Sequence, residues 1–116
     1  MVSWKNLDTL ASYGKLMALK DSVNLVEAMS GENGAKRVAE YCVPMACDLK
    51  YNFAAKAVDD KILGVLQELA DEQQLTEKYA ELYNGAVINT GEKRLVLHQL
   101  CRGQQGGDVI ADGVNK

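Results

Sequence analysis

The chain has 116 residues, of which 47% are hydrophobic and 25% are charged, and its formal net charge is -3. A chain of this length can bury a core as one domain, and its composition lies far from that of disordered proteins. The negative net charge argues against a nucleic-acid partner, because binding to phosphates needs clustered Lys and Arg.

The first residues carry no targeting or membrane signal. Asp8 comes early and no continuous apolar run follows it, so neither a signal peptide nor a membrane span is expected. The chain has three cysteines, Cys42, Cys47 and Cys101. Their number is odd and too low for a disulfide scaffold, so we interpret them as buried thiols. These features predict a cytoplasmic protein.

The N-terminal part of the chain has helical patterns. Residues 3–20 have apolar side chains close to helical spacing, with Ser3 as the expected N-cap. A second helical segment, residues 24–29, is expected to stop in the glycine-containing run 30–34. Residues 35–40 then predict a short helix.

Residues 41–53 break the helical pattern. Leu49, Tyr51 and Phe53 alternate with polar residues, which is the period of a half-buried strand. This segment predicts a small strand pair. Pro44 cannot donate a hydrogen bond to a neighbouring strand, so its strand should lie at an edge or end there.

The strongest helical pattern lies at residues 59–72, whose apolar side chains form one wide stripe. Leu66 belongs to that stripe, so Leu66→Ala should cost about 2–5 kcal/mol if the side chain lies in the core. Thr76 is the expected cap of a shorter helix that stops at Asn84 and Gly85.

A last helix is expected to start at Asn89, because Glu92 follows it with the spacing of a capping box. Arg94, His98 and Arg102 recur every four residues and would share one face of that helix. Such a face could bind an anion. A solvated or partner-facing stripe is the more common meaning of the pattern, since basic residues are favoured near a helix C-terminus.

The fold class expected from these elements is mainly α with a small β-hairpin. Residues 1–103 form the predicted helical domain, with the strand pair near residues 41–53, and residues 104–116 form a loop or linker. The glycine-rich tail holds few large apolar residues, and it suggests a connection to further polypeptide.

The chemical motifs are weak. Cys42 and Cys47 have C-x4-C spacing, but His98 is the one histidine of the chain and lies far from them, so neither a metal site nor a Cys-His catalytic pair is favoured. The glycines near the C-terminus do not follow a convincing buried strand, as a phosphate loop requires. We therefore predict no catalytic, cofactor-binding or metal-binding residue and no cofactor.

One stretch is far more specific than these patterns. Residues 84–102 resemble the G-x-x-I-N-x-T-E-x-R-A-V-L-H-x-A-L-R segment of the glucose-6-phosphate isomerase family. The positions that match are Gly85, Ile88, Asn89, Glu92, Arg94, Val96, Leu97, His98 and Arg102. The positions that depart from it are Gly91, Leu95, Leu100 and Cys101. Residues 48–56 are similar to the family strand L-x-x-D-Y-S-K-N, and residues 107–116 to a loop before its connecting helix.

The resemblance implies an N-terminal helical fragment of an α/β sugar-isomerase (SIS) enzyme of glycolysis and gluconeogenesis, which interconverts glucose 6-phosphate and fructose 6-phosphate. The family's catalytic groups lie in sugar-isomerase domains that follow this region, so this chain alone is expected to be inactive, and His98 is not the catalytic histidine. Asn89, Glu92, Arg94, His98 and Arg102 would form a motif face toward those missing domains. The family is usually dimeric, and hexose phosphate would bind the full-length enzyme.

Two alternatives remain open at this point. The chain could be a free-standing helical interaction module that kept this ancestry without the enzyme. It could also be an independent small-molecule binder that uses the basic face of the last helix, in which case a sugar phosphate should raise its melting temperature.

Overall fold

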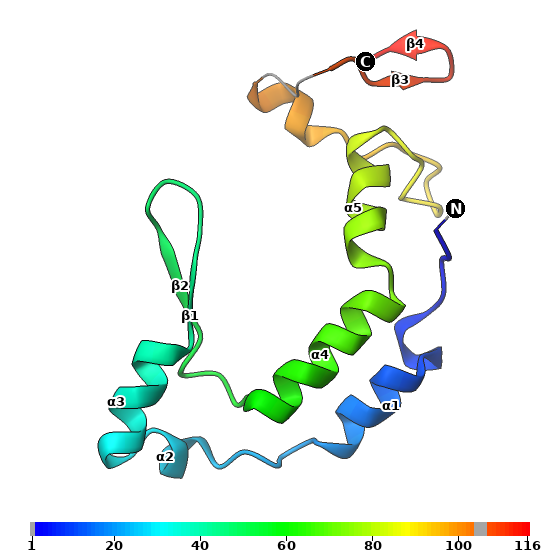
Figure 1. The fold of residues 1–116 in the computed structure, drawn as a ribbon. Helices are drawn as coiled ribbons and strands as arrows, with labels where there is room; N and C mark the ends of the chain where they lie inside the picture. Colours follow the sequence, from blue (N-terminus) through cyan, green and yellow to red (C-terminus); the bar gives the residue numbers. More distant parts are fainter. Residues whose placement is uncertain (1, 104–106) are drawn as a thin grey trace. The chain divides into compact units, whose positions relative to one another are not determined.

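The computed structural model describes residues 2–103 and 107–116 (Figure 1). The chain separates into two compact units, one formed by Leu7–Leu69 and the other by the described residues on either side of that stretch. In chain order the helices are η1 Leu7–Thr9, α1 Ala11–Ala18, α2 Leu25–Ala28, α3 Gly31–Glu40, α4 Asp60–Glu72, α5 Leu75–Tyr83 and η2 His98–Arg102. The strands are β1 Cys42–Pro44, β2 Lys50–Asn52, β3 Ile110–Ala111 and β4 Val114–Asn115. The prediction of a mainly helical fold with a small antiparallel hairpin is confirmed.

The first predicted helix is shorter than expected. Ser3 does not cap it, because the first helical residue is Leu7, and the backbone N–H of Ser3 donates to Oε1 of Gln74 at 2.8 Å. The Nε2 of Gln73 donates to the carbonyl of Lys5 at 3.2 Å. These long-range bonds hold the first residues outside any helix, and only a 3-10 turn precedes α1.

The glycine-containing run after α2 begins a helix, where the sequence predicted a stop. Asn24 caps α2, and its side chain accepts a hydrogen bond from the N–H of Glu27. Gly31 has a φ of 59° and already belongs to α3, so the expected gap at residues 30–34 is wrong. A Cβ at Gly34 would collide with the carbonyl of Met29, so the glycine permits the close approach of α2 and α3.

The predicted strand pair is confirmed. β1 pairs antiparallel with β2, with Val43 opposite Tyr51, and β1 ends at Pro44 as expected. In the turn that joins them, Cys47 and Asp48 both have a φ of 57°. The two-strand arm stands out from the rest of its unit in Figure 1.

The strongest predicted helix forms as α4. Oδ1 of Asp59 accepts from the N–H of Ile62 at 2.8 Å and so caps the helix. Ile62 and Leu69 are buried, but Leu66 is 37% exposed, so its placement in the core is wrong. The apolar stripe of α4 is wider than the part of it that neighbouring elements cover.

The helix after α4 begins earlier than predicted. Leu75 is its first residue, and Gln74 precedes it with a left-handed backbone, so Thr76 lies inside α5 and is not its cap. The predicted stop is confirmed, because the helix ends at Tyr83 and the N–H of Asn84 donates to the carbonyl of Ala80 at 2.9 Å.

The C-terminal residues form a second hairpin that the sequence did not predict. β3 and β4 pair antiparallel, and Asp112 and Gly113 between them have positive φ. Val109 and Ala111 are buried, and a Cβ at Gly85 would come within 2.9 Å of a Val109 methyl carbon. Residues 104–106 of the predicted loop lie outside the described residues.

The prediction of buried thiols is wrong. Cys42 is half-buried on β1, whereas Cys47 and Cys101 are exposed. Cys47 lies at the hairpin turn, where a side chain projects from the sheet and few neighbours can cover it. In the part of the chain that the structure describes, no helix is long and apolar enough to cross a membrane.

Candidate functional site

Three of the predicted site residues meet in one turn. The N–H of Glu92 donates to Oδ1 of Asn89 at 3.1 Å, and Nδ2 of Asn89 donates to Oε2 of Glu92 at 3.3 Å. Nη1 of Arg94 lies 3.8 Å from Oε2 of Glu92, and the N–H of Arg94 donates to the carbonyl of Asn89 at 3.1 Å. The capping-type hydrogen bond between Asn89 and Glu92 has formed.

The helix that this cap was expected to open is absent. Asn89 and Arg94 form an isolated antiparallel bridge, and Lys93 between them has a φ of 52°. Between Asn89 and Arg102, all of which the structure describes, the one helical element is the 3-10 helix η2 at His98–Arg102. A helix draws most of its stability from packing of its apolar face, and Gly91 in its first turn would cost about 1 kcal/mol relative to Ala.

The basic face therefore does not exist as predicted. Arg94 lies in the bridge, whereas His98 and Arg102 lie at the two ends of η2. The side chains of Arg94 and Glu92 are 76% and 63% exposed. Exposed charges of this kind are screened by solvent, and the geometry that suggested an anion site on one helix face is lost.

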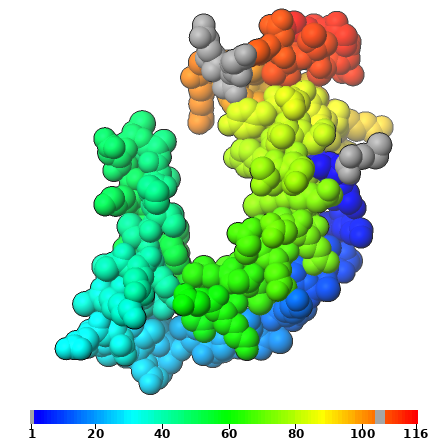
Figure 2. Space-filling model, viewed as in Figure 1, coloured from blue at the N-terminus to red at the C-terminus, as the bar shows by residue number. Residues whose placement is uncertain are grey.

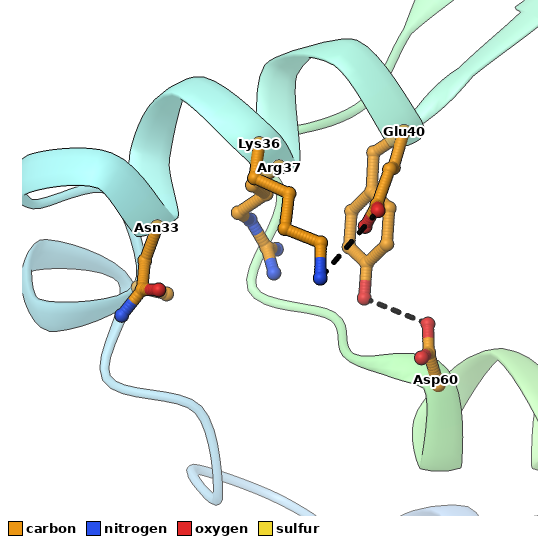
Figure 3. Close-up of a pocket in the computed structure, with 7 residues that line it drawn as sticks. Asn33, Lys36, Arg37, Glu40 and Asp60 are labelled. Carbon is orange, nitrogen blue, oxygen red and sulfur yellow. Dashed lines mark hydrogen bonds and ion pairs between the residues drawn. The ribbon is translucent and has the colours of Figure 1, made fainter.

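A polar pocket of about 200 Å³ lies elsewhere, between α3 and the start of α4 (Figure 3). The residues that line it are Ala28, Asn33, Lys36, Arg37, Glu40, Tyr41 and Asp60. Nζ of Lys36 lies 3.7 Å from Oε1 of Glu40, one helical turn along α3. Both signs of charge line the pocket, so it does not select an anion or a cation by net charge.

Arg37 uses its guanidinium to hold the fold. Its Nε donates to the carbonyl of Ala54 at 2.7 Å, and its Nη2 donates to the carbonyls of Lys56 and Val58 at 2.8 and 2.6 Å. The guanidinium carbon also lies 4.4 Å from the centre of the Tyr41 ring. Arg37 therefore joins α3 to the segment that connects β2 with α4.

Tyr41 is the pocket residue with altered acidity. Desolvation raises the pKa of its hydroxyl above the usual 10.0, and the hydrogen bond to Asp60 raises it further. The hydroxyl donates to Oδ1 of Asp60 at 3.0 Å. A phenol with a raised pKa stays neutral near pH 7, so it acts here as a hydrogen-bond donor and not as a base.

The described residues contain no group of three or more His, Cys, Asp or Glu side chains that could hold a metal ion.

The patterns in the sequence did not predict the polar pocket. The spacing of Lys36 and Glu40 on a predicted helix was the available signal, but the three carbonyl partners of Arg37 lie 17 to 21 residues away, and no local pattern identifies them.

Comparison with known proteins gives one consistent result. The family model described as phosphoglucose isomerase matches residues 52–116. The glucose-6-phosphate isomerase of Treponema denticola is 51% identical over 118 residues, which cover 98% of this chain and 22% of the relative.

Two less similar relatives agree. The glucose-6-phosphate isomerase of Treponema pallidum is 46% identical over 95% of this chain and 21% of the relative, and that of Borrelia garinii is 42% identical over 97% and 20%. The chain thus spans about a fifth of the length of these relatives and corresponds to their N-terminal portion. The chain belongs to the phosphoglucose isomerase family.

Proposed function

We propose that this chain serves as the N-terminal helical segment of a glucose-6-phosphate isomerase, whose full-length form interconverts glucose 6-phosphate and fructose 6-phosphate in glycolysis and gluconeogenesis. The observation that carries the proposal is the 51% identity to the Treponema denticola isomerase over nearly the whole chain. A free-standing module is less favoured, because these relatives carry the same segment within much longer proteins.

The segment acts as a scaffold and leaves the chemistry to sugar-isomerase domains on further polypeptide. Aldose–ketose isomerisation moves a proton, which calls for an acid and a base with separated pKa values. The polar pocket supports this division of roles. Lys36 pairs with Glu40, Arg37 is occupied by backbone carbonyls, and the hydroxyl of Tyr41 donates to Asp60.

Further parts of the proposal concern the chain's organisation. Residues 1–103 form the helical domain, and residues 104–116 lead to the sugar-isomerase domains. Asn89, Glu92, Arg94, His98 and Arg102 face those domains in the full-length enzyme, which is a cytoplasmic protein and a homodimer. No cofactor takes part, and hexose phosphate binds to the full-length form.

The proposal is tested by an isomerase assay on the 116-residue chain, produced in a host that lacks its own glucose-6-phosphate isomerase. The formation of glucose 6-phosphate from fructose 6-phosphate is followed with a coupling dehydrogenase. We expect no turnover above the protein-free control from the chain alone. Activity is expected when a Treponema denticola isomerase that lacks its matching segment is added. Turnover by the chain alone would refute the division of roles.

A further inference from the structure

An apolar groove of about 330 Å³ lies between the β1–β2 hairpin and α4. The residues that line it are Val43, Tyr51, Phe53, Lys56, Val58, Leu63 and Leu66. Figure 2 shows the hairpin projecting beside the start of α4. Of the lining residues only Lys56 carries a charge.

One face of the hairpin forms one wall of the groove. Val43 and Tyr51 are cross-strand partners and therefore point to the same side of the pair. Phe53 follows Tyr51 by two residues, and their rings stack with centroids 6.1 Å apart. Leu63 and Leu66 of α4 form the opposite side of the groove. The groove is thus built on two elements of the same compact unit.

The groove walls are open to solvent in this chain. Val43 is 44% exposed, Tyr51 47% and Leu66 37%. Met45 and Leu49, next to them on the hairpin, are 55% and 62% exposed. A continuous apolar surface of this kind marks a place where another surface packs.

We propose that the groove receives an apolar segment from the remaining polypeptide of the same isomerase. This inference rests on the proposed function. The relatives are several times longer than this chain, which spans 22% of the Treponema denticola protein, so most of such an enzyme lies outside the structure. The family match begins at residue 52 and includes the groove residues from Phe53 to Leu66. The groove's apolar chemistry suits packing within one protein better than binding of a charged sugar phosphate.

A second copy of the chain fits the groove less well. In a twofold pair centred on this site the same patch would face itself. A concave surface would then meet a concave surface, and the ammonium of Lys56 would meet another cation. Neither contact is complementary, so the occupant we assign is the remainder of the enzyme.

The test uses a chimera in which this chain replaces the matching segment of the Treponema denticola isomerase. Leu66→Glu is compared with Val26→Glu, which lies on α2 outside the groove and is 80% exposed. We expect Leu66→Glu to lower the Tm of the chimera by about 5 °C or more beyond the amount by which it lowers the Tm of the 116-residue chain. Val26→Glu should shift neither by more than about 2 °C. An equal effect of Leu66→Glu in both proteins would overturn the inference.

Footprinting with a carbene reagent gives an answer that does not depend on a variant. Tyr51 and Leu66 should be labelled at least about fivefold less in the unsubstituted chimera than in the chain alone, while labelling of Val26 changes little. If Tyr51 and Leu66 remain fully labelled in an active chimera, the inference fails and the proposed function stands. If the chain alone sediments as a dimer that Leu66→Glu dissociates, a second copy covers the groove and the inference is wrong.

Discussion

Arg37 links parts of the chain that are far apart in sequence. Its guanidinium donates to the carbonyls of Ala54, Lys56 and Val58, which lie outside any strand or helix in the segment between β2 and α4. Hydrogen bonds from a charged donor contribute more than neutral ones, and a carbonyl left without its partner loses that stabilisation. One side chain thus fixes the path from the hairpin to α4.

We predict that Arg37→Ala lowers the free energy of unfolding by about 2 kcal/mol or more. Lys36→Ala, one position earlier on the same helix, should change it by less than about 0.5 kcal/mol, since the pair with Glu40 is exposed and long at 3.7 Å. Urea denaturation of both variants measures the difference. Equal losses would show that Arg37 does not hold the fold.

Tyr41 should make stability depend on alkaline pH. The folded-state pKa is raised by desolvation and by Asp60, so the neutral hydroxyl stabilises the fold fully below its usual pKa of 10.0. That contribution is lost as the pH rises through the higher folded-state pKa. Above about pH 10 the wild-type chain should therefore lose stability more steeply than Tyr41→Phe. Parallel urea-midpoint profiles from pH 8 to 11 for the two proteins would contradict this assignment.

At the scale of the elements, α4 separates buried from exposed apolar positions. Ile62 is 7% exposed and Leu66 is 37% exposed, although both belong to the same predicted stripe. We predict that Ile62→Ala costs about 2–5 kcal/mol in the 116-residue chain and that Leu66→Ala costs less than about 1.5 kcal/mol. Thermal or urea unfolding of the two variants checks the ranking. A larger loss for Leu66→Ala would show that the groove is closed in the isolated chain.

The turn of the β1–β2 hairpin holds a cysteine in an unfavourable backbone region. Cys47 has a φ of 57°, which costs a side-chain-bearing residue about 1–2 kcal/mol and costs glycine little. Cys47→Gly should therefore stabilise the chain by about 0.5–1 kcal/mol after the added entropy of the unfolded state is counted. Cys47→Ala is the matched control and should bring no gain. A loss of stability with Cys47→Gly in urea denaturation would argue against this turn geometry.

Local signals in the sequence predicted several elements well. The alternation at Tyr51 and Phe53 predicted the hairpin, and the apolar period predicted α4, because each pattern shows which side chains share one face of an element. The spacing of Asn89 and Glu92 correctly indicated their hydrogen bond. It did not predict whether a helix follows, since that depends on what packs against the apolar residues after it.

The remaining errors have a common physical origin. Ser3 was expected to cap a helix, but no helix begins before Leu7, and the N–H of Ser3 donates to Gln74, 71 residues away. Leu66 was assigned to the core because a stripe shows which face is apolar and not how much of it is covered. The polar pocket likewise depends on contacts of Arg37 with distant carbonyls. Long-range contacts, which no local pattern encodes, decide these features.

At the scale of the whole molecule, the central claim is that this chain is a scaffold for an isomerase whose reacting groups lie elsewhere in the protein. The most direct measurement is the isomerase activity of the chimera that carries this chain in place of the matching Treponema denticola segment. We predict a kcat within about tenfold of that of the parent enzyme, while the 116-residue chain alone gives none. An inactive chimera that is folded and has the parent's oligomeric state, or turnover by the chain alone, would contradict the account.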